Sequence, residues 1–296
     1  MSLSGENSHH QQRLEQYIHM KHHRIRSVLI CLLIILLALV ILFLRGDFGS
    51  IDLGFIKTYP NSDKYQSGGT SISQKVEKID INWISGKVNI ISGKSNEITF
   101  SETSPAKLNE QNSLHYWVDG TTLRIRPNGP GFNINLPSKE LTLELPEGFT
   151  ADTLKIEVVS ADMEVTGIKA DRLEIHSTSG SLEAELSTGE LSVETVSGNV
   201  SVTGDKTKQV KASTVSGDIS LTFRKAPSNM QLDSVSGDMT VQLPSGTEFT
   251  LGVSTVSGDL DSEFAVVHEN NKYICGDGEN NYQINTVSGD IRLKAE

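Results

Sequence analysis

Alternating apolar and polar residues fill most of this 296-residue chain, and one uninterrupted apolar run stands near its N-terminus. The apolar run extends from Val28 to Leu44 without a charged or strongly polar side chain. From about residue 76 the alternation has a period of two, which is typical of half-buried β-strands. The pattern predicts an all-β protein preceded by one apolar helix.

The apolar run is expected to be a transmembrane helix. Its 17 residues would span roughly 26 Å, close to the thickness of the hydrocarbon core of a bilayer. A cleaved signal peptide is the alternative, but the polar segment before the run is long and no small-residue cleavage site follows it. Lys21, Arg24 and Arg26 precede the run, so the positive-inside rule predicts a cytoplasmic N-terminus and an extracellular C-terminal part.

These patterns divide the chain into four predicted parts and place the protein in the cell membrane as a single-pass protein. The parts are a basic, His-rich cytoplasmic tail (1–26), a transmembrane signal anchor (27–45), a linker (46–75) and an extracellular β-domain (76–296). Within the β-domain, residues 76–150 are irregular and residues 151–296 form a regular repeat.

The repeat is the heptapeptide TVSGDIS at 214–220, which recurs with small changes at 195, 234, 255 and 286. The last step between copies is lengthened by an insertion at 264–283. Apolar residues recur at fixed distances before and after the motif, so stacked copies would form continuous apolar ladders. This favours a right-handed β-solenoid with about 20 residues per coil. An antiparallel meander is the alternative, because Gly-Asp also suits a hairpin turn.

The glycine of each motif is expected to form a bend that needs a positive φ or a close backbone approach. These candidate structural residues are Gly198, Gly217, Gly237, Gly258 and Gly289. Which residues of the Thr-Val-Ser triplet point inward stays open: either Val215, or the pair Thr214 and Ser216.

The aspartate that follows the glycine would form a row with a spacing of about 5 Å in stacked coils. Its members are Asp218, Asp238, Asp259 and Asp290, preceded by Asn199. The favoured interpretation is that each carboxylate accepts backbone hydrogen bonds in its own bend. The alternative is a row of cation sites, although hard cations need six or more oxygen ligands and the row offers one carboxylate per coil.

Composition and motifs argue against catalysis and against nucleic-acid binding. The formal net charge is −11, whereas phosphate backbones need clustered Lys and Arg. Cys31 and Cys275 provide no disulfide framework, and no catalytic or metal-binding motif occurs. Glu183 and Glu194 are the one acidic pair considered for polysaccharide chemistry, and solvation is the favoured interpretation. We expect a non-enzyme that needs no cofactor.

The repeated VSGD and VSGN motifs, after a single anchor in an acidic β-rich chain, resemble the bacterial "putative adhesin" β-strand-repeat family. The arrangement is similar to LiaG-like proteins of Gram-positive bacteria, which are associated with the cell-envelope stress response. The resemblance implies a membrane protein that binds a cell-wall polymer, a lipid headgroup or a membrane-protein partner. An adhesin for external ligands and a polysaccharide-active enzyme are the other two hypotheses.

Overall fold

The computed structural model describes residues 59–130 and 137–296, and in this part the protein is all-β, as the sequence predicts. The N-terminal strands are β1 (Gln66–Ser67), β2 (Thr70–Ile72), β3 (Lys78–Gly93), β4 (Ile98–Thr103), β5 (His115–Asp119), β6 (Thr122–Arg126) and β7 (Lys139–Pro146). The strands of the repeats are β8 (Thr150–Ser179), β9 (Leu182–Ser197), β10 (Val200–Asp205), β11 (Gln209–Ser216), β12 (Ile219–Phe223), β13 (Asn229–Ser236), β14 (Met239–Leu243), β15 (Phe249–Ser257), β16 (Leu260–Ser262), β17 (Val267–Glu269), β18 (Lys272–Cys275), β19 (Asn280–Ser288) and β20 (Ile291–Ala295). Helical structure in these ranges is limited to two 3-10 turns, η1 (Ser62–Lys64) and η2 (Glu110–Asn112).

The predicted transmembrane segment, residues 27–45, lies outside the described residues. Within residues 59–130 and 137–296, no helix has the length and apolar character needed to cross a bilayer. The single-pass anchor and its orientation therefore stay predictions.

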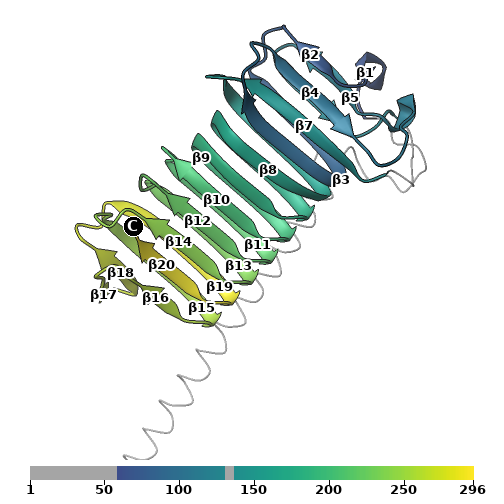
Figure 1. Cartoon of the computed structure of the whole chain (residues 1–296). Coiled ribbons are helices and arrows are strands. Elements are labelled where there is room, and N and C mark those ends of the chain that lie inside the picture. Colours follow the sequence, from purple (N-terminus) through teal and green to yellow (C-terminus); the bar gives the residue numbers. More distant parts are fainter. Residues whose placement is uncertain (1–58, 131–136) are drawn as a thin grey trace, which may run out of the picture. The chain divides into compact units, whose positions relative to one another are not determined.

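Strands of neighbouring coils pair in parallel and in register, so each repeat lies beside a copy of itself (Figure 1). Ser216 in the TVSGD motif is opposite Ser197 on one side and Ser236 on the other. This pairing is that of a β-solenoid and excludes the antiparallel meander for the repeats, because a meander would pair successive strands in opposite directions. The handedness of the coil stays a prediction.

The serine and glycine of the motif form a corner that divides each coil into two strand segments. We call the segments before the corner the pre-corner layer and those after it the post-corner layer. In the repeats, the pre-corner layer includes the last part of β8, the second half of β9, and β11, β13, β19 and β15. The post-corner layer includes the middle part of β8, the first half of β9, and β10, β12, β14, β20 and β16.

Apolar ladders from the two layers form the core, as the sequence predicts. The buried pre-corner positions include Val193, Ala212, Leu232 and Ile284, and the buried post-corner positions include Val200, Ile219, Met239 and Ile291. Burying one such aliphatic side chain contributes about 1.5–3 kcal/mol. Each coil therefore depends on its neighbours for most of its stability.

The side-chain directions in the Thr-Val-Ser triplet match neither of the two predicted alternatives. Thr214 is buried in the core, Val215 is half-buried on the outer surface, and Ser216 is exposed at the corner. The strand alternation holds through Thr214 and Val215, and the bend at Gly217 then turns Ser216 toward solvent. Only the threonine position thus contributes to the core.

The last coil of the chain is not the last coil of the stack. β19 pairs with β13 on one side and with β15 on the other, and β20 lies between β14 and β16. The final two coils therefore do not stack in chain order. The insertion explains the difference: it forms the hairpin β17–β18, and β18 runs antiparallel beside the start of β15 before the chain returns.

The opposite end of the stack is closed by antiparallel strands. β5 covers β6, and β4 covers β7, each through an antiparallel pairing of five residues. The first regular corner also lies here, because Ser85 in β3 pairs with Ser160 and Gly86 has a φ of 104°. The regular coils therefore begin within residues 76–150, for which the sequence pattern predicts an irregular structure.

Candidate functional site

An open groove of about 560 Å³ crosses the outer surface of the pre-corner layer. Strand alternation builds it, because side chains on either side of each buried residue point outward. The polar side chains that line it include Gln209, Lys211, Asn229, Gln231, Asn281 and Gln283. They belong to β11, β13 and β19, so the groove runs across strands rather than along one.

Three of these side chains form a row of free amides. Gln209 lies opposite Asn229, and Asn229 lies opposite Asn281, in the parallel register of the layer. The spacing between neighbouring strands is about 4.8 Å. Within the described residues, none of the three amide groups binds another protein group, and all three side chains are exposed. The row presents donors and acceptors at a regular interval to whatever enters the groove.

Charged residues flank the amide row at both ends of the groove. At one end, Arg172 in β8 forms an ion pair with Glu190 in β9, at 2.6 Å. At the other end, Lys272 projects from β18 of the insertion. Beside the row, Lys211 binds Glu194 at 2.9 Å. The groove thus combines neutral amides with three cationic side chains on an otherwise acidic chain.

Glu194 makes the free energy of unfolding depend on pH in a predictable direction. The hydrogen bond from His176, followed by the hydrogen bond and charge of Lys211, lowers the pKa of Glu194 to about 2 although burial opposes the shift. Because the folded pKa lies below the ordinary value, the stabilisation is present above pH 4.5 and is lost as the pH falls toward 2. We expect wild type to lose roughly 2 kcal/mol more than Glu194→Gln over this interval, measured by urea unfolding at each pH. If wild type and Glu194→Gln lost the same free energy of unfolding over this pH interval, the lowered pKa of Glu194 would be contradicted.

The aspartate row lies at the corners, outside the groove, and its hydrogen bonds join neighbouring coils. The backbone N–H of Asp238 donates to Asp218 Oδ1 at 2.9 Å, and that of Asp290 donates to Asp238 Oδ1 at 2.9 Å. The N–H of Asp259 donates to Asp290 Oδ1 at 3.1 Å, and Asn199 accepts from Asp218 at 3.0 Å. The prediction that each aspartate accepts hydrogen bonds within its own bend is therefore wrong. Stacking places the N–H of a neighbouring coil beside the carboxylates of Asp218, Asp238 and Asp290, which a single repeat cannot reveal.

Arg292 in β20 also binds the aspartate row. Its guanidinium contacts Asp238 at 2.8 Å and Asp290 at 3.1 Å, so a cation of the protein offsets the repulsion between these two carboxylates. The N–H of Asp290, followed by Arg292, lowers the pKa of Asp238. Within residues 59–130 and 137–296, no cluster of three or more His, Cys, Asp or Glu side chains is arranged to hold a metal ion.

The motif glycines occupy the corners with a left-handed backbone. Their φ angles lie between 132° and 142° in Gly198, Gly217, Gly237, Gly258 and Gly289. Each glycine also approaches the carbonyl of the corner glycine in an adjacent coil. Conformation and space therefore both require glycine here.

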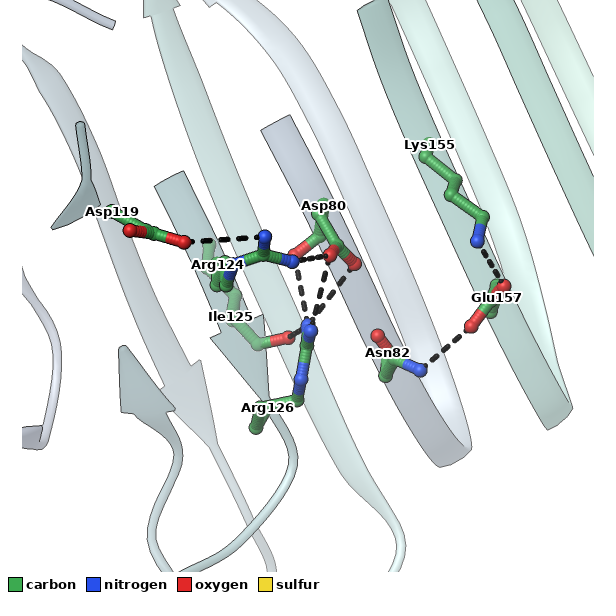
Figure 2. Close-up of polar contacts among 8 residues, drawn as sticks. All are labelled: Asp80, Asn82, Asp119, Arg124, Ile125, Arg126, Lys155 and Glu157. Atoms are coloured by element: carbon green, nitrogen blue, oxygen red, sulfur yellow. Dashed lines mark hydrogen bonds and ion pairs between the residues drawn. The ribbon is translucent and has the colours of Figure 1, made fainter. Parts of the chain in front are cut away.

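A second polar cluster, at the N-terminal end of the outer pre-corner surface, is not indicated by the sequence pattern. Figure 2 shows Arg124 and Arg126 of β6 both directed at the carboxylate of Asp80 in β3, with ion-pair distances of 2.6 and 3.1 Å. In the same view, Asn82 donates to Glu157 of β8 at 2.8 Å. These residues are paired with one another, which suits a role in holding β6, β3 and β8 together. Their alternation in the sequence predicts exposed side chains, but Asn82 and Glu157 are only 6% and 4% exposed. Only the strand order brings the residues of the cluster into contact.

The residues considered for catalysis are not assembled into a site. Glu183 lies in the post-corner half of β9 and Glu194 in its pre-corner half, so the two carboxylates belong to different layers. Of the three histidines in the described residues, His176 binds Glu194 at 3.3 Å. His115 Nδ1 lies 3.0 Å from the carbonyl of Ser113, and the ring of His268 contacts Tyr273.

One family model and several solved structures are similar to this chain. The family model described as Toastrack DUF4097 matches residues 76–294. No curated protein matches the sequence. Among solved structures, a "putative adhesin" from Bacteroides fragilis is 10% identical, with a TM-score of 0.41, and covers 78% of this chain and 97% of its own.

Two further solved structures are similar over comparable lengths. A "putative cell adhesion protein" from Clostridium sporogenes is 15% identical, with a TM-score of 0.32, and covers 78% of this chain and 100% of its own. A "putative lipid binding protein" from Parabacteroides distasonis is 15% identical, with a TM-score of 0.36, and covers 77% of this chain and 96% of its own.

Proposed function

The chain belongs to the Toastrack DUF4097 family, and we propose that it is a non-catalytic surface protein that binds a polymer of the cell envelope along its pre-corner groove. In this proposal, residues 27–45 anchor the protein in the membrane with the N-terminus in the cytoplasm. The β-domain then lies outside the cell, where the LiaG-like resemblance associates it with the envelope stress response.

The row of free amides in Gln209, Asn229 and Asn281 is the observation that supports this function. Side-chain amides both donate and accept hydrogen bonds, so they suit a ligand rich in hydroxyl and acetamido groups, such as a wall glycan. The row follows the stacking direction, and a polymer with regularly repeated polar groups can meet several amides at once. Exposed amides on separate strands carry little cost in the free protein, because water satisfies them.

The cations around the row extend the ligand class to polymers with some negative charge. Arg172 and Lys211 are paired with carboxylates, whereas Lys272 forms no ion pair within the described residues. A wall polymer that carries phosphate or carboxylate groups is therefore attracted locally, although the chain as a whole is acidic. A strongly anionic ligand would instead be repelled by the net charge.

The test is binding of the full-length protein, in detergent micelles, to purified cell-wall fragments by co-sedimentation. The triple variant Gln209→Ala, Asn229→Ala and Asn281→Ala removes the amide row. Each hydrogen bond contributes about 1 kcal/mol, so we expect binding to weaken roughly tenfold to a hundredfold.

A matched control uses the outward row of the other layer, where Thr203, Thr222 and Gln242 are in register. Alanine at these three positions should leave wall binding unchanged. Equal loss in both triple variants, or no loss in the amide variant, would reject the groove as the binding site. Binding of external host polymers in place of wall fragments would favour the adhesin hypothesis.

A further inference from the structure

The last coil of the stack, formed by β15 and β16, lacks a neighbour at its corner. On their inner sides β15 pairs with β19 and β16 pairs with β20. On the outer side of β15, β18 of the insertion covers only Phe249–Leu251. In the part of the chain that the structure describes, no strand pairs with residues 254–262 on their outer side. We call residues 254–262 the open corner.

Burial differs between the open corner and the corners inside the stack. In the parallel register Thr255 is aligned with Thr286 and Ser234, which are both buried. Thr255 itself is exposed, and Val256 beside it is 47% exposed. At the other end of the stack, β5 and β4 cover the first coil. One more strand at the open corner would therefore bury positions that the inner coils already bury.

The backbone of the open corner repeats hydrogen-bonding groups that the inner corners use. In the preceding coil the N–H of Gly289 donates to the carbonyl of Ser257, and the N–H of Ile291 donates to the carbonyl of Asp259. Within the described residues, no further coil supplies carbonyls to the two equivalent N–H groups of the open corner. Strands whose outer donors and acceptors are unpaired are the ones that accept an added strand.

The carboxylate of Asp259 lacks the hydrogen bond that its counterparts accept. Asp218, Asp238 and Asp290 each accept the N–H of a residue in a neighbouring coil. Asp259 is the last member of the row, and no N–H of the described residues reaches its carboxylate. The open corner therefore offers two outward N–H groups and one carboxylate in the arrangement that binds a stacked coil elsewhere in the protein.

The same geometry requires glycine at the bend of any segment that stacks on the open corner. A Cβ on Gly258 would lie 2.1 Å from the carbonyl oxygen of Gly289, and a Cβ on Gly289 would lie 2.2 Å from that of Gly237. A residue stacked on Gly258 in the same way has the carbonyl of Gly258 in this place. A side chain there would prevent the close approach, so the added segment must have glycine at its bend.

The charges of the open corner favour a basic segment. Asp259 and Asp261 are both exposed. Arg292, which contacts Asp238 and Asp290, lies opposite Asp261 but on the inner side of β16. Lys or Arg at the same place on an added strand would be the matching cation on the outer side. A second copy of this chain does not suit the open corner, because its motifs carry aspartate and its net charge is −11.

We propose that the open corner binds an extended basic segment of a partner protein as an added parallel strand, with glycine at the bend of the segment and Lys or Arg in the residues that follow. The segment pairs along residues 254–262 and stops before the part of β15 that β18 covers. None of the residues that line the amide groove belongs to the open corner. The partner and the ligand of the groove therefore bind at separate places.

The first test uses the labelled peptide acetyl-STVSGKIRL-amide as the probe and measures its fluorescence anisotropy with the full-length protein in detergent micelles. We expect the peptide to bind wild type, and Asp259→Ala with Asp261→Ala to raise the dissociation constant about tenfold or more. The matched control, Asp171→Ala with Glu183→Ala, removes two exposed carboxylates far from the open corner and should bind as wild type does. No binding to wild type, or equal losses in the two double variants, would overturn the proposal.

A second test separates strand addition from simple attraction between charges. The peptide acetyl-STVSVKIRL-amide keeps both basic residues but has valine at the bend, so it should bind about tenfold more weakly or less. With the glycine peptide bound, hydrogen exchange should slow in residues 254–262 and stay unchanged in the equivalent inner segment, residues 194–202. Equal affinity of the two peptides, or no protection of residues 254–262, would show that no strand is added at the open corner.

Discussion

Gly237→Ala is expected to lower the free energy of unfolding by about 3 kcal/mol or more, an unusually large effect for the addition of one methyl group. Gly237 has a φ of 134°, which an L-residue with a Cβ adopts at a cost of about 1–2 kcal/mol. A Cβ built there would lie 2.2 Å from the carbonyl oxygen of Gly217 and 2.7 Å from its carbon. Because these contacts are with backbone atoms of a stacked coil, relief requires the coils to separate.

The matched control for this variant is Gly246→Ala, in the turn after β14. A Cβ at Gly246 meets nothing within 4 Å, and its φ is not in the left-handed region. We expect its unfolding midpoint in urea to stay within the equivalent of about 0.5 kcal/mol of wild type, or to rise slightly because alanine restricts the unfolded chain. Equal midpoints for the two variants would show that the corner tolerates a side chain. The geometric argument would then fail.

The corner illustrates what the repeat makes predictable. A residue that recurs at one place in every copy must satisfy one local requirement, so the glycine positions and the apolar ladders follow from the spacing alone. The environment of the aspartates does not follow in the same way. Asp218 binds the N–H of a residue 20 positions away, and that contact exists only after two coils have stacked. The sequence therefore indicates the bend but not which coil the carboxylate stabilises.

The order of the final coils is also beyond what the repeat determines. The corners containing Asp238, Asp259 and Asp290 are nearly identical, so any of them can stack on any other with the same ladder contacts. The segment that joins β16 to β19 decides which coil stacks on which. Its hairpin β17–β18 brings the chain around the coil that ends in β16. Phe264, just before this hairpin, packs against Phe249 at 5.3 Å between ring centroids. Neither feature has a counterpart in the other repeats.

The amide groove was only partly predictable. Alternation places Gln209, Asn229 and Asn281 on an outer surface, and an alignment of the repeats puts Gln209 and Asn229 in one column. Asn281 joins this row only because β19 is inserted next to β13. In chain order the neighbour of Asn229 would be Thr250, and the row would end after two amides. The candidate site thus depends on the same exchange of coils that the sequence did not indicate.

Lys139→Met is expected to destabilise the protein by about 3–5 kcal/mol, because it leaves a buried carboxylate without its partner. The side chains of Lys139 and Glu102 are 3% and 7% exposed, and their charged atoms lie 2.6 Å apart. The ammonium also donates to the carbonyls of Asn112 and Pro127 and lies 4.9 Å from the ring centre of Trp83. Burial lowers the pKa of Lys139, whereas the hydrogen bond and charge of Glu102 oppose this shift. The ion pair joins β4 of the N-terminal cover to β7 of the first coil.

An exposed ion pair serves as the control, because it carries the same charges as Lys139 and Glu102 without their burial. Lys87 and Glu164 lie 2.8 Å apart, but their side chains are 44% and 48% exposed. Because exposed pairs contribute about 0–1 kcal/mol, Lys87→Met should change the urea midpoint little. The double variant Lys139→Met and Glu102→Leu should recover part of the loss, since no buried charge is then left unpaired. Recovery will be incomplete, because Glu102 Oε1 also accepts the N–H of Leu114 at 2.6 Å. Equal losses for Lys139→Met and Lys87→Met would refute the role given to the buried pair.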